Sequence, residues 1–294
     1  MPWEWLWHGE QYANHFIGPE RAFRYWDGWL PYLSNEPLWN LFAAATTPIA
    51  DTIGWRNWVR LLSFFSLLII SYYILSSSPS RYWAIALLLI TSPLILNNYI
   101  SGVRQTLAIS LFLLALMSPR FIATPTVFAT PLIHSTFFFT LPFYFLALTE
   151  IISLKTKIVI VVAASISLIL LVPVIADLLG ARQADRRNLE IELMIRPLWL
   201  YLVVVAMIFF LSGRNFIKEH QVATFGIMFY LVTLPLGGAG VSPRVIENFF
   251  PLIFISFSYL RGFGLYIIFL ASLPAIAFLW MRGITTPSPE LFGF

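Results

Sequence analysis

The chain has 294 residues, of which 59% are hydrophobic, 17% aromatic and 11% charged, and its formal net charge is +4. Such a composition, with a mean hydropathy of +0.80, excludes a soluble globular domain and is typical of an integral membrane protein. No cysteine is present, which excludes disulfides and thiolate metal sites. No basic run interleaved with aromatic residues stands outside the apolar segments, so nucleic acid is not an expected partner.

Residues 1–35 form an amphiphilic segment rich in Trp and Tyr, without a hydrophobic run of spanning length and without a recognisable secretory leader. Because Trp and Tyr favour the headgroup level of a bilayer, we predict that this segment lies at the membrane surface. The next stretch, PLWNLFAAATTPIA at 37–50, has about 14 residues, which fits an interfacial or re-entrant helix at least as well as a full crossing.

Further segments are long and apolar enough to cross a membrane, which takes about 20 mostly apolar residues. They lie at 57–75, 82–98, 103–118, 157–178, 197–212, 221–238, 244–260 and 263–281. Residues 121–149 can form a helical hairpin around His134, with helices made irregular by Pro125, Pro131 and Pro142. We therefore predict an all-α fold: one integral membrane domain over 1–294, a polytopic bundle of about 9–11 membrane helices including re-entrant or interfacial segments.

The lysines and arginines predict the orientation of this bundle, because they favour cytoplasmic loops. Alternating the loops between two faces puts every lysine on one face, in short connections that we assign to the cytoplasm. That face holds Arg81, Arg120, Lys155, Lys157, Arg214, Lys218 and Arg261. The opposite, extracytoplasmic face carries Arg104, His134, Arg244 and the charged loop 179–196.

Ionisable residues are rare near the centres of the apolar segments and gather at their ends. Ion-coupled transporters and proton pumps need ionisable groups or broken helices near the middle of the membrane. The pattern therefore favours an enzyme that acts on a lipid headgroup over a permease.

Arginines at segment ends are candidates for binding an anionic headgroup. Arg104 and Gln105 open the apolar helix VRQTLAISLFLLALM, and a guanidinium offers a fixed fork of donors for phosphate oxygens. An arginine that anchors a helix end by snorkelling explains the same position equally well. Arg244, in LGGAGVSPRVIENFF, follows three glycines whose backbone N–H groups can approach an anion.

The loop GARQADRRNLEIELMIR carries a further group of arginines, Arg182, Arg186 and Arg187. Arg186 and Glu190 have the i, i+4 spacing of a helical ion pair, which favours a solvated charged helix. The functional alternative is that some of these arginines hold a pyrophosphate, which several cationic groups do better than one.

Three side chains are candidates for a general base. His134 is a lone imidazole in FATPLIHSTFFF, and a lone histidine is more often structural than catalytic, but the predicted hairpin puts it on the same face as Arg104. Asp27 and Glu36 lie in YWDGWLPYLSNEPLWNL, where a carboxylate could deprotonate a sugar hydroxyl. Glu36 precedes Pro37 and suits a helix start equally well, so the residues alone leave the choice open.

Together, VRQTLAISLFLLAL, LIHSTFFF, YWDGWLPYLSNEPLWNL and SPRVIENFF make the chain resemble the EpsG family of exopolysaccharide polymerases, which is similar in kind to the Wzy O-antigen and capsule polymerases. The resemblance runs from Asp27 to Phe250 and is concentrated in the Arg-Gln helix and the histidine. Family members begin with a membrane span ahead of the acidic segment, a feature that 1–35 does not show. The resemblance implies a GT-C-like glycosyltransferase of the bacterial inner (plasma) membrane that joins undecaprenyl-pyrophosphate-linked oligosaccharide repeat units without a metal or other cofactor.

By position, Arg104, Gln105 and His134 correspond to recurrent polar residues of that family, and Asp27, Glu36 and Arg244 correspond more weakly. The implied partners are the lipid-linked oligosaccharides, the bilayer, a chain-length regulator and a flippase. Two other functions remain open: a lipid-linked glycan flippase or transporter, which would need a deep cationic cavity, and a membrane-bound acyltransferase with His134 as base, which would not need clustered arginines.

Overall fold

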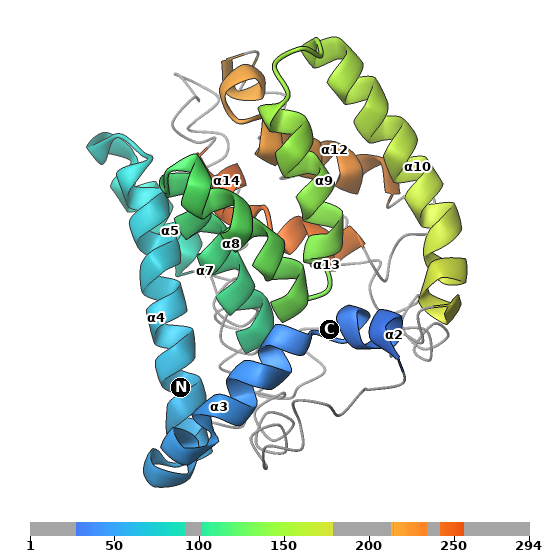
Figure 1. The fold of residues 1–294 in the computed structure, drawn as a ribbon. Coiled ribbons are helices and arrows are strands. Elements are labelled where there is room, and N and C mark those ends of the chain that lie inside the picture. Colours follow the sequence, from blue (N-terminus) through green and yellow to red (C-terminus); the bar gives the residue numbers. More distant parts are fainter. Residues whose placement is uncertain (1–27, 92–101, 179–212, 214, 234–241, 256–294) are drawn as a thin grey trace, which may run out of the picture. The chain divides into compact units, whose positions relative to one another are not determined.

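The computed structural model describes residues 28–91, 102–178, 213, 215–233 and 242–255. All regular secondary structure in these ranges is helical (Figure 1), so the all-α prediction is confirmed for them. Two compact units can be distinguished. Among the described residues, unit 1 holds 28–73, 87–91 and 102–135, and unit 2 holds 74–86, 136–178, 213, 215–233 and 242–255.

Unit 1 is built around a helical hairpin. Its helices in chain order are α2 (Trp29–Ser34), α3 (Pro37–Ile53), most of α4 (Trp55–Ser76), the end of α5 (Trp83–Ile90), α7 (Val103–Met117) and α8 (Arg120–Ile133). The short connection at Ser118 and Pro119 returns α8 along α7, and α3 packs against α8 (Figure 1). Ala108, Ile109 and Phe112 of α7 are completely buried, so α7 supplies much of the core of this unit.

Within the described part of the chain, α4 alone has the length and composition of a membrane-spanning helix, with 22 residues. At about 1.5 Å per residue it is about 33 Å long, close to the hydrocarbon thickness of about 30 Å. One side of it exposes large apolar residues at helical spacing: Leu61, Phe64, Phe65, Leu68 and Tyr72. At its beginning, the guanidinium carbon of Arg56 lies 5.3 Å from the ring centroid of Trp55. α7, α9 and α12 are apolar but shorter.

Unit 2 has an aromatic core. Its elements are the 3-10 helix η3 (Ser80–Tyr82), the start of α5, and α9 (Phe137–Leu148), α10 (Leu154–Leu178), α12 (Gln221–Thr233), α13 (Ser242–Glu247) and α14 (Phe250–Ile255). α12 packs against α9, α10 and α13. The ring of Phe143 on α9 lies 5.7 Å from Phe229 of α12 and 6.1 Å from Phe249, centroid to centroid. Gly226 of α12 faces Phe249 so closely that an added Cβ would lie 2.4 Å from the ring.

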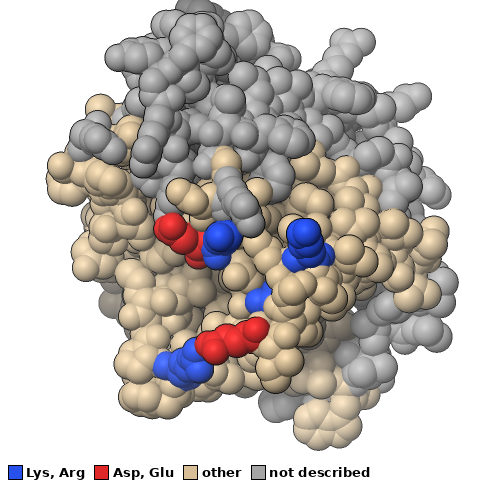
Figure 2. Space-filling view, turned by 90° about the horizontal axis from the view of Figure 1, so that it is seen from above, with Lys and Arg blue, Asp and Glu red and all other residues tan. Residues whose placement is uncertain are grey.

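A buried lysine fastens three helix ends of unit 2. Lys157, in the first turn of α10, is 4% exposed. Its Nζ donates to the carbonyl of Ala147 at the end of α9 (3.0 Å) and to Oε1 of Gln221 at the start of α12 (2.8 Å). Figure 2 shows acidic and basic side chains interspersed among uncharged ones on one face of the molecule.

The helix boundaries agree with several predicted segments. The segments 57–75, 103–118 and 157–178 correspond to α4, α7 and α10, and the two helices predicted on either side of His134 correspond to α8 and α9. α5 covers the first part of 82–98, and α12 the first part of 221–238. The segments 197–212 and 263–281, the loop 179–196 and residues 1–27 lie outside the described residues.

One predicted segment is wrong: 244–260 does not begin as a single continuous helix. The helix breaks at Asn248 and Phe249, between α13 and α14. The reason is Pro251, which has no N–H to donate to the carbonyl of Glu247. The turn is closed instead by Asn248 N to Val245 O (3.2 Å) and Phe249 N to Ile246 O (2.9 Å).

A second proline is accommodated inside a helix. Pro131 of α8 cannot donate to the carbonyl of Val127. The hydroxyl of Thr130 donates to that carbonyl at 2.7 Å, and Thr130 is 1% exposed. α8 therefore continues to Ile133 and positions the turn that follows it.

Candidate functional site

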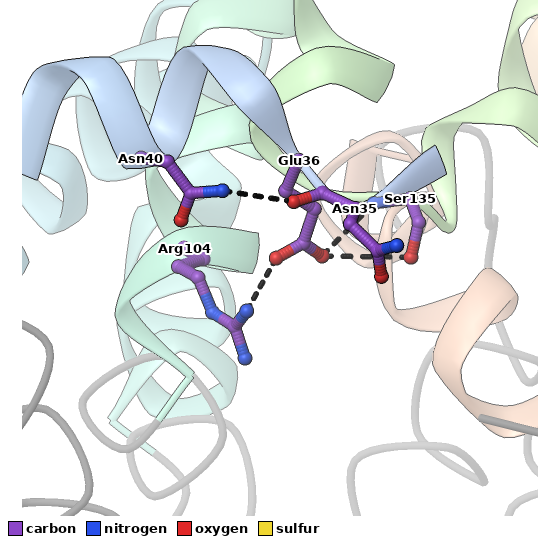
Figure 3. A network of polar contacts seen from close by, with 5 residues as sticks. All are labelled: Asn35, Glu36, Asn40, Arg104 and Ser135. Atoms are coloured by element: carbon purple, nitrogen blue, oxygen red, sulfur yellow. Dashed lines mark hydrogen bonds and ion pairs between the residues drawn. The ribbon is translucent and has the colours of Figure 1, made fainter. Parts of the chain in front are cut away.

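The open end of the α7–α8 hairpin brings together three segments that are far apart in sequence. α7 begins at Val103 and α8 ends at Ile133, so the antiparallel packing puts Arg104 and the residues after Ile133 at the same end. The first turn of α3 lies against this end, and Figure 3 shows the polar contacts that result. All of these residues belong to unit 1.

Glu36 is the centre of these contacts. Its Oε2 accepts a hydrogen bond from Nη1 of Arg104, which also makes the two side chains an ion pair. Its Oε1 accepts from the backbone N–H of Ser135 at 3.2 Å and from the Ser135 hydroxyl at 3.4 Å. The Glu36 side chain is 6% exposed, whereas the Arg104 side chain is 23% exposed. The carboxylate is therefore enclosed, and part of the arginine side chain reaches the surface.

The corner between α2 and α3 is held by amides. The carbonyl of Glu36 accepts from the backbone N–H of Asn40 at 3.1 Å, and Nδ2 of Asn40 donates to the carbonyl of Asn35 at 3.1 Å. Both asparagines are buried. The Glu36 backbone has φ 61° and ψ 55°, the left-handed conformation, and its carboxylate makes no capping hydrogen bond to its own helix.

His134 follows directly after α8. Its backbone N–H donates to the carbonyl of Thr130 at 2.9 Å, and its backbone is extended, with φ −144°. The residue is half-buried, as is Gln105, which follows Arg104 on α7. The structure thus puts the backbones of His134 and Arg104 at one end of the hairpin, and the peptide after His134 contacts the same carboxylate as Arg104.

The other predicted site residues lie in unit 2 or outside the described residues. Arg244 is in α13 of unit 2. Asp27, Arg182, Arg186 and Arg187 lie outside the described residues. In the described ranges, no group of three or more His, Cys, Asp or Glu residues could hold a metal ion.

The sequence interpretation missed part of the network. Ser135 was visible only as the neighbour of His134, and its role depends on a contact with a residue 99 positions away. The position of Asn40 in the sequence was a weak indication of its contact. It stands one helical turn after Glu36, from where its side chain can hydrogen-bond to the backbone just before the helix. Asn35 takes part through its carbonyl, for which side-chain type gives no signal.

Comparison with protein-family models, with curated proteins and with solved structures found no match.

Chemically, the group offers a guanidinium whose direction is fixed by a carboxylate, next to a histidine. Arg104 and Glu36 together carry no net charge, so the pair can orient donors toward an anion while adding little long-range attraction for it. An anionic ligand at this place would need additional positive charge from elsewhere in the protein.

Proposed function

We propose that this protein is a polysaccharide polymerase of the EpsG and Wzy kind. As such it is a polytopic, GT-C-like glycosyltransferase of the bacterial inner membrane, which joins undecaprenyl-pyrophosphate-linked oligosaccharide repeat units into exopolysaccharide, capsule or O-antigen. The observation that carries the proposal is the convergence of Glu36, Arg104 and the His134–Ser135 peptide at the open end of one helical hairpin.

The membrane part of the proposal rests on composition and on α4. The chain has 59% hydrophobic residues, and the exposed apolar side of α4 is the kind of surface that lipid hydrocarbon covers. The aromatic and arginine residues at the start of α4, Trp55 and Arg56, suit the headgroup level.

In the proposed reaction, Arg104 holds the diphosphate of the donor. A bond forms between an acceptor hydroxyl oxygen and the anomeric carbon of the donor sugar, and the bond from that carbon to the diphosphate oxygen breaks. Undecaprenyl pyrophosphate departs with the bonding electrons, and the base takes the hydroxyl proton. Guanidinium donors lower the barrier because negative charge develops on the departing diphosphate.

Additional cations are needed because Glu36 neutralises Arg104. We assign them to Arg244 and to the loop residues Arg182, Arg186 and Arg187, as the sequence predicts. The proton acceptor is one of His134, Glu36 and Asp27. Gln105 contributes a polar contact to the substrate beside Arg104. The reaction as proposed uses no metal.

The decisive experiment uses purified protein in lipid nanodiscs with lipid-linked repeat units. Extension to longer chains indicates a polymerase; movement of the lipid between leaflets indicates a flippase, and acyl transfer an acyltransferase. Arg104→Lys keeps the charge but loses the fork. Losing about 1.5–3 kcal/mol of charge-assisted hydrogen bonding would slow chain extension about 10- to 100-fold.

Arg120→Lys is the matched control, because Arg120 also opens a helix of the hairpin but is exposed at the start of α8. It should extend chains at the wild-type rate. If Arg104→Lys extended chains at the wild-type rate, Arg104 would not hold the donor diphosphate through its guanidinium fork. In cells, deletion of the gene should abolish the polymer ladder and leave single-repeat glycan intact.

A further inference from the structure

Glu36 has a backbone conformation that its sequence disfavours. It is the one non-glycine residue with positive φ among the described residues, and side chains with a Cβ rarely adopt this region. The next residue is Pro37, which sterically pushes its predecessor toward extended conformations. A residue held against both preferences is fixed by its surroundings, and such positions cluster at functional sites.

The contacts that fix Glu36 are made by its carboxylate. Three donors from two distant segments occupy the two oxygens: Arg104, 68 residues away, and the N–H and hydroxyl of Ser135, 99 residues away. The carboxylate does not cap α3, which is the ordinary role of an acidic residue before a helix. Its place in the fold is therefore to join the start of α3, the start of α7 and the turn after α8.

A general base needs an oxygen that the substrate hydroxyl can reach. The Glu36 side chain is 6% exposed, and both of its oxygens already accept hydrogen bonds inside the protein. Arg104, by contrast, has a side chain that is 23% exposed. The Arg104 guanidinium is therefore the group that a ligand can contact, and the Glu36 carboxylate is the buried group that holds it.

We propose that Glu36 is a positioning residue: its carboxylate directs the Arg104 guanidinium toward a polyprenyl diphosphate and fixes the turn that carries His134, and it does not accept the proton. This inference rests on the proposed function and narrows its choice of base to the two remaining candidates. It also identifies Ser135 as the residue through which the turn is held.

The test is a double-mutant cycle with the product lipid as probe. Binding of undecaprenyl pyrophosphate to protein in nanodiscs is measured for wild type, Glu36→Gln, Arg104→Gln and the double variant. If Glu36 acts through Arg104, Glu36→Gln weakens binding about tenfold in the wild-type background and less than about twofold in the Arg104→Gln background. Equal effects in both backgrounds would overturn the proposal, as would unchanged or tighter binding by Glu36→Gln, the latter because it would show that Glu36 acts mainly by neutralising Arg104.

The pH dependence of chain extension separates positioning from proton transfer. Loss of a base removes the acid limb of the kcat/KM profile, whereas loss of a positioning group lowers the profile and keeps the limb at the same midpoint. We expect the limb to persist in Glu36→Gln. Its disappearance, with lipid affinity unchanged, would make Glu36 the base.

Two milder variants cover the case in which Glu36→Gln does not fold. Glu36→Asp keeps the charge but is too short to contact both Arg104 and Ser135, and Ser135→Ala removes one of the three hydrogen bonds. Both should weaken lipid binding, Glu36→Asp more strongly. Wild-type affinity in both, with thermal unfolding midpoints that show folded protein, would refute the positioning role.

The two proposals can fail separately. Wild-type protein could bind undecaprenyl pyrophosphate in a manner that depends on Glu36 and Arg104 but never extend chains. In that case the proposed polymerase function is refuted, and the positioning role of Glu36 is kept for a protein that binds a diphosphate lipid. If wild-type protein does not bind the lipid, the positioning role falls as well.

Discussion

Gly226→Ala should destabilise unit 2, because the substitution adds a methyl group where α12 meets Phe249. The added Cβ would lie 2.4, 2.5 and 2.7 Å from three ring carbons of Phe249, all shorter than a van der Waals contact. The ring cannot easily move away, since Phe249 is completely buried and packs against Phe143 at a centroid distance of 6.1 Å.

Two opposing terms set the size of the effect. Overpacking a core by one methyl group costs about 1–3 kcal/mol, and replacing glycine by alanine inside a helix returns up to about 1 kcal/mol. The net loss should be about 1–2 kcal/mol if the ring shifts partially. At about 2–4 °C per kcal/mol for a chain of this size class, the unfolding midpoint should fall by several degrees.

Thermal unfolding of purified protein in one detergent, followed by intrinsic fluorescence, measures this shift. Val222→Ala is the matched control, because it lies on the same helix, is not fully buried and adds no atoms. Gly226→Ala combined with Phe249→Leu should recover part of the loss, since leucine has no ring at the contact. A Gly226→Ala midpoint equal to or above wild type would refute the packing of α12 against the helix break.

Two further predictions concern single polar groups. Thr130→Val should lower the free energy of unfolding by about 1–3 kcal/mol, because it leaves the Val127 carbonyl without the donor that replaces the missing proline N–H. Thr126→Val is the control: the Thr126 hydroxyl donates to the carbonyl of Ile122, which keeps its ordinary helical N–H donor in the variant. Its unfolding midpoint should therefore change by much less, and equal shifts in the two variants would contradict this account. Burial lowers the pKa of His220 below its ordinary 6.5, against the opposing charge of the adjacent glutamate, so the unfolded chain binds the proton more readily than the folded protein and stability falls as pH drops below about 6.5. His220→Gln should show a shallower loss of unfolding midpoint between about pH 7 and pH 5, and an unchanged slope would show that His220 does not contribute.

The sequence predicted those elements that depend on local apolar length. α4, α7 and α10 follow from uninterrupted hydrophobic runs, and the two helices α8 and α9 follow from two such runs on either side of His134 and Ser135. The break between α13 and α14 could also have been predicted from Pro251 and its missing N–H, which the sequence interpretation did not use.

The candidate site was less accessible to sequence reasoning. Arg104 and His134 were predicted to share one face, but the residue that links their segments is Glu36, whose partners are 68 and 99 positions away. Residue order alone carries no signal for such contacts. The left-handed backbone of Glu36 runs against the preference of a residue before proline, so local rules predict the wrong conformation at this position.

Lys157 constrains the order in which the protein can assemble during translation. Its acceptor Gln221 comes 64 residues later in the chain, so before α12 is synthesised the ammonium group can donate to the carbonyl of Ala147 and to water, but not to Gln221. α12 supplies the second acceptor of the buried lysine, so we expect unit 2 to close only after α12 has been synthesised.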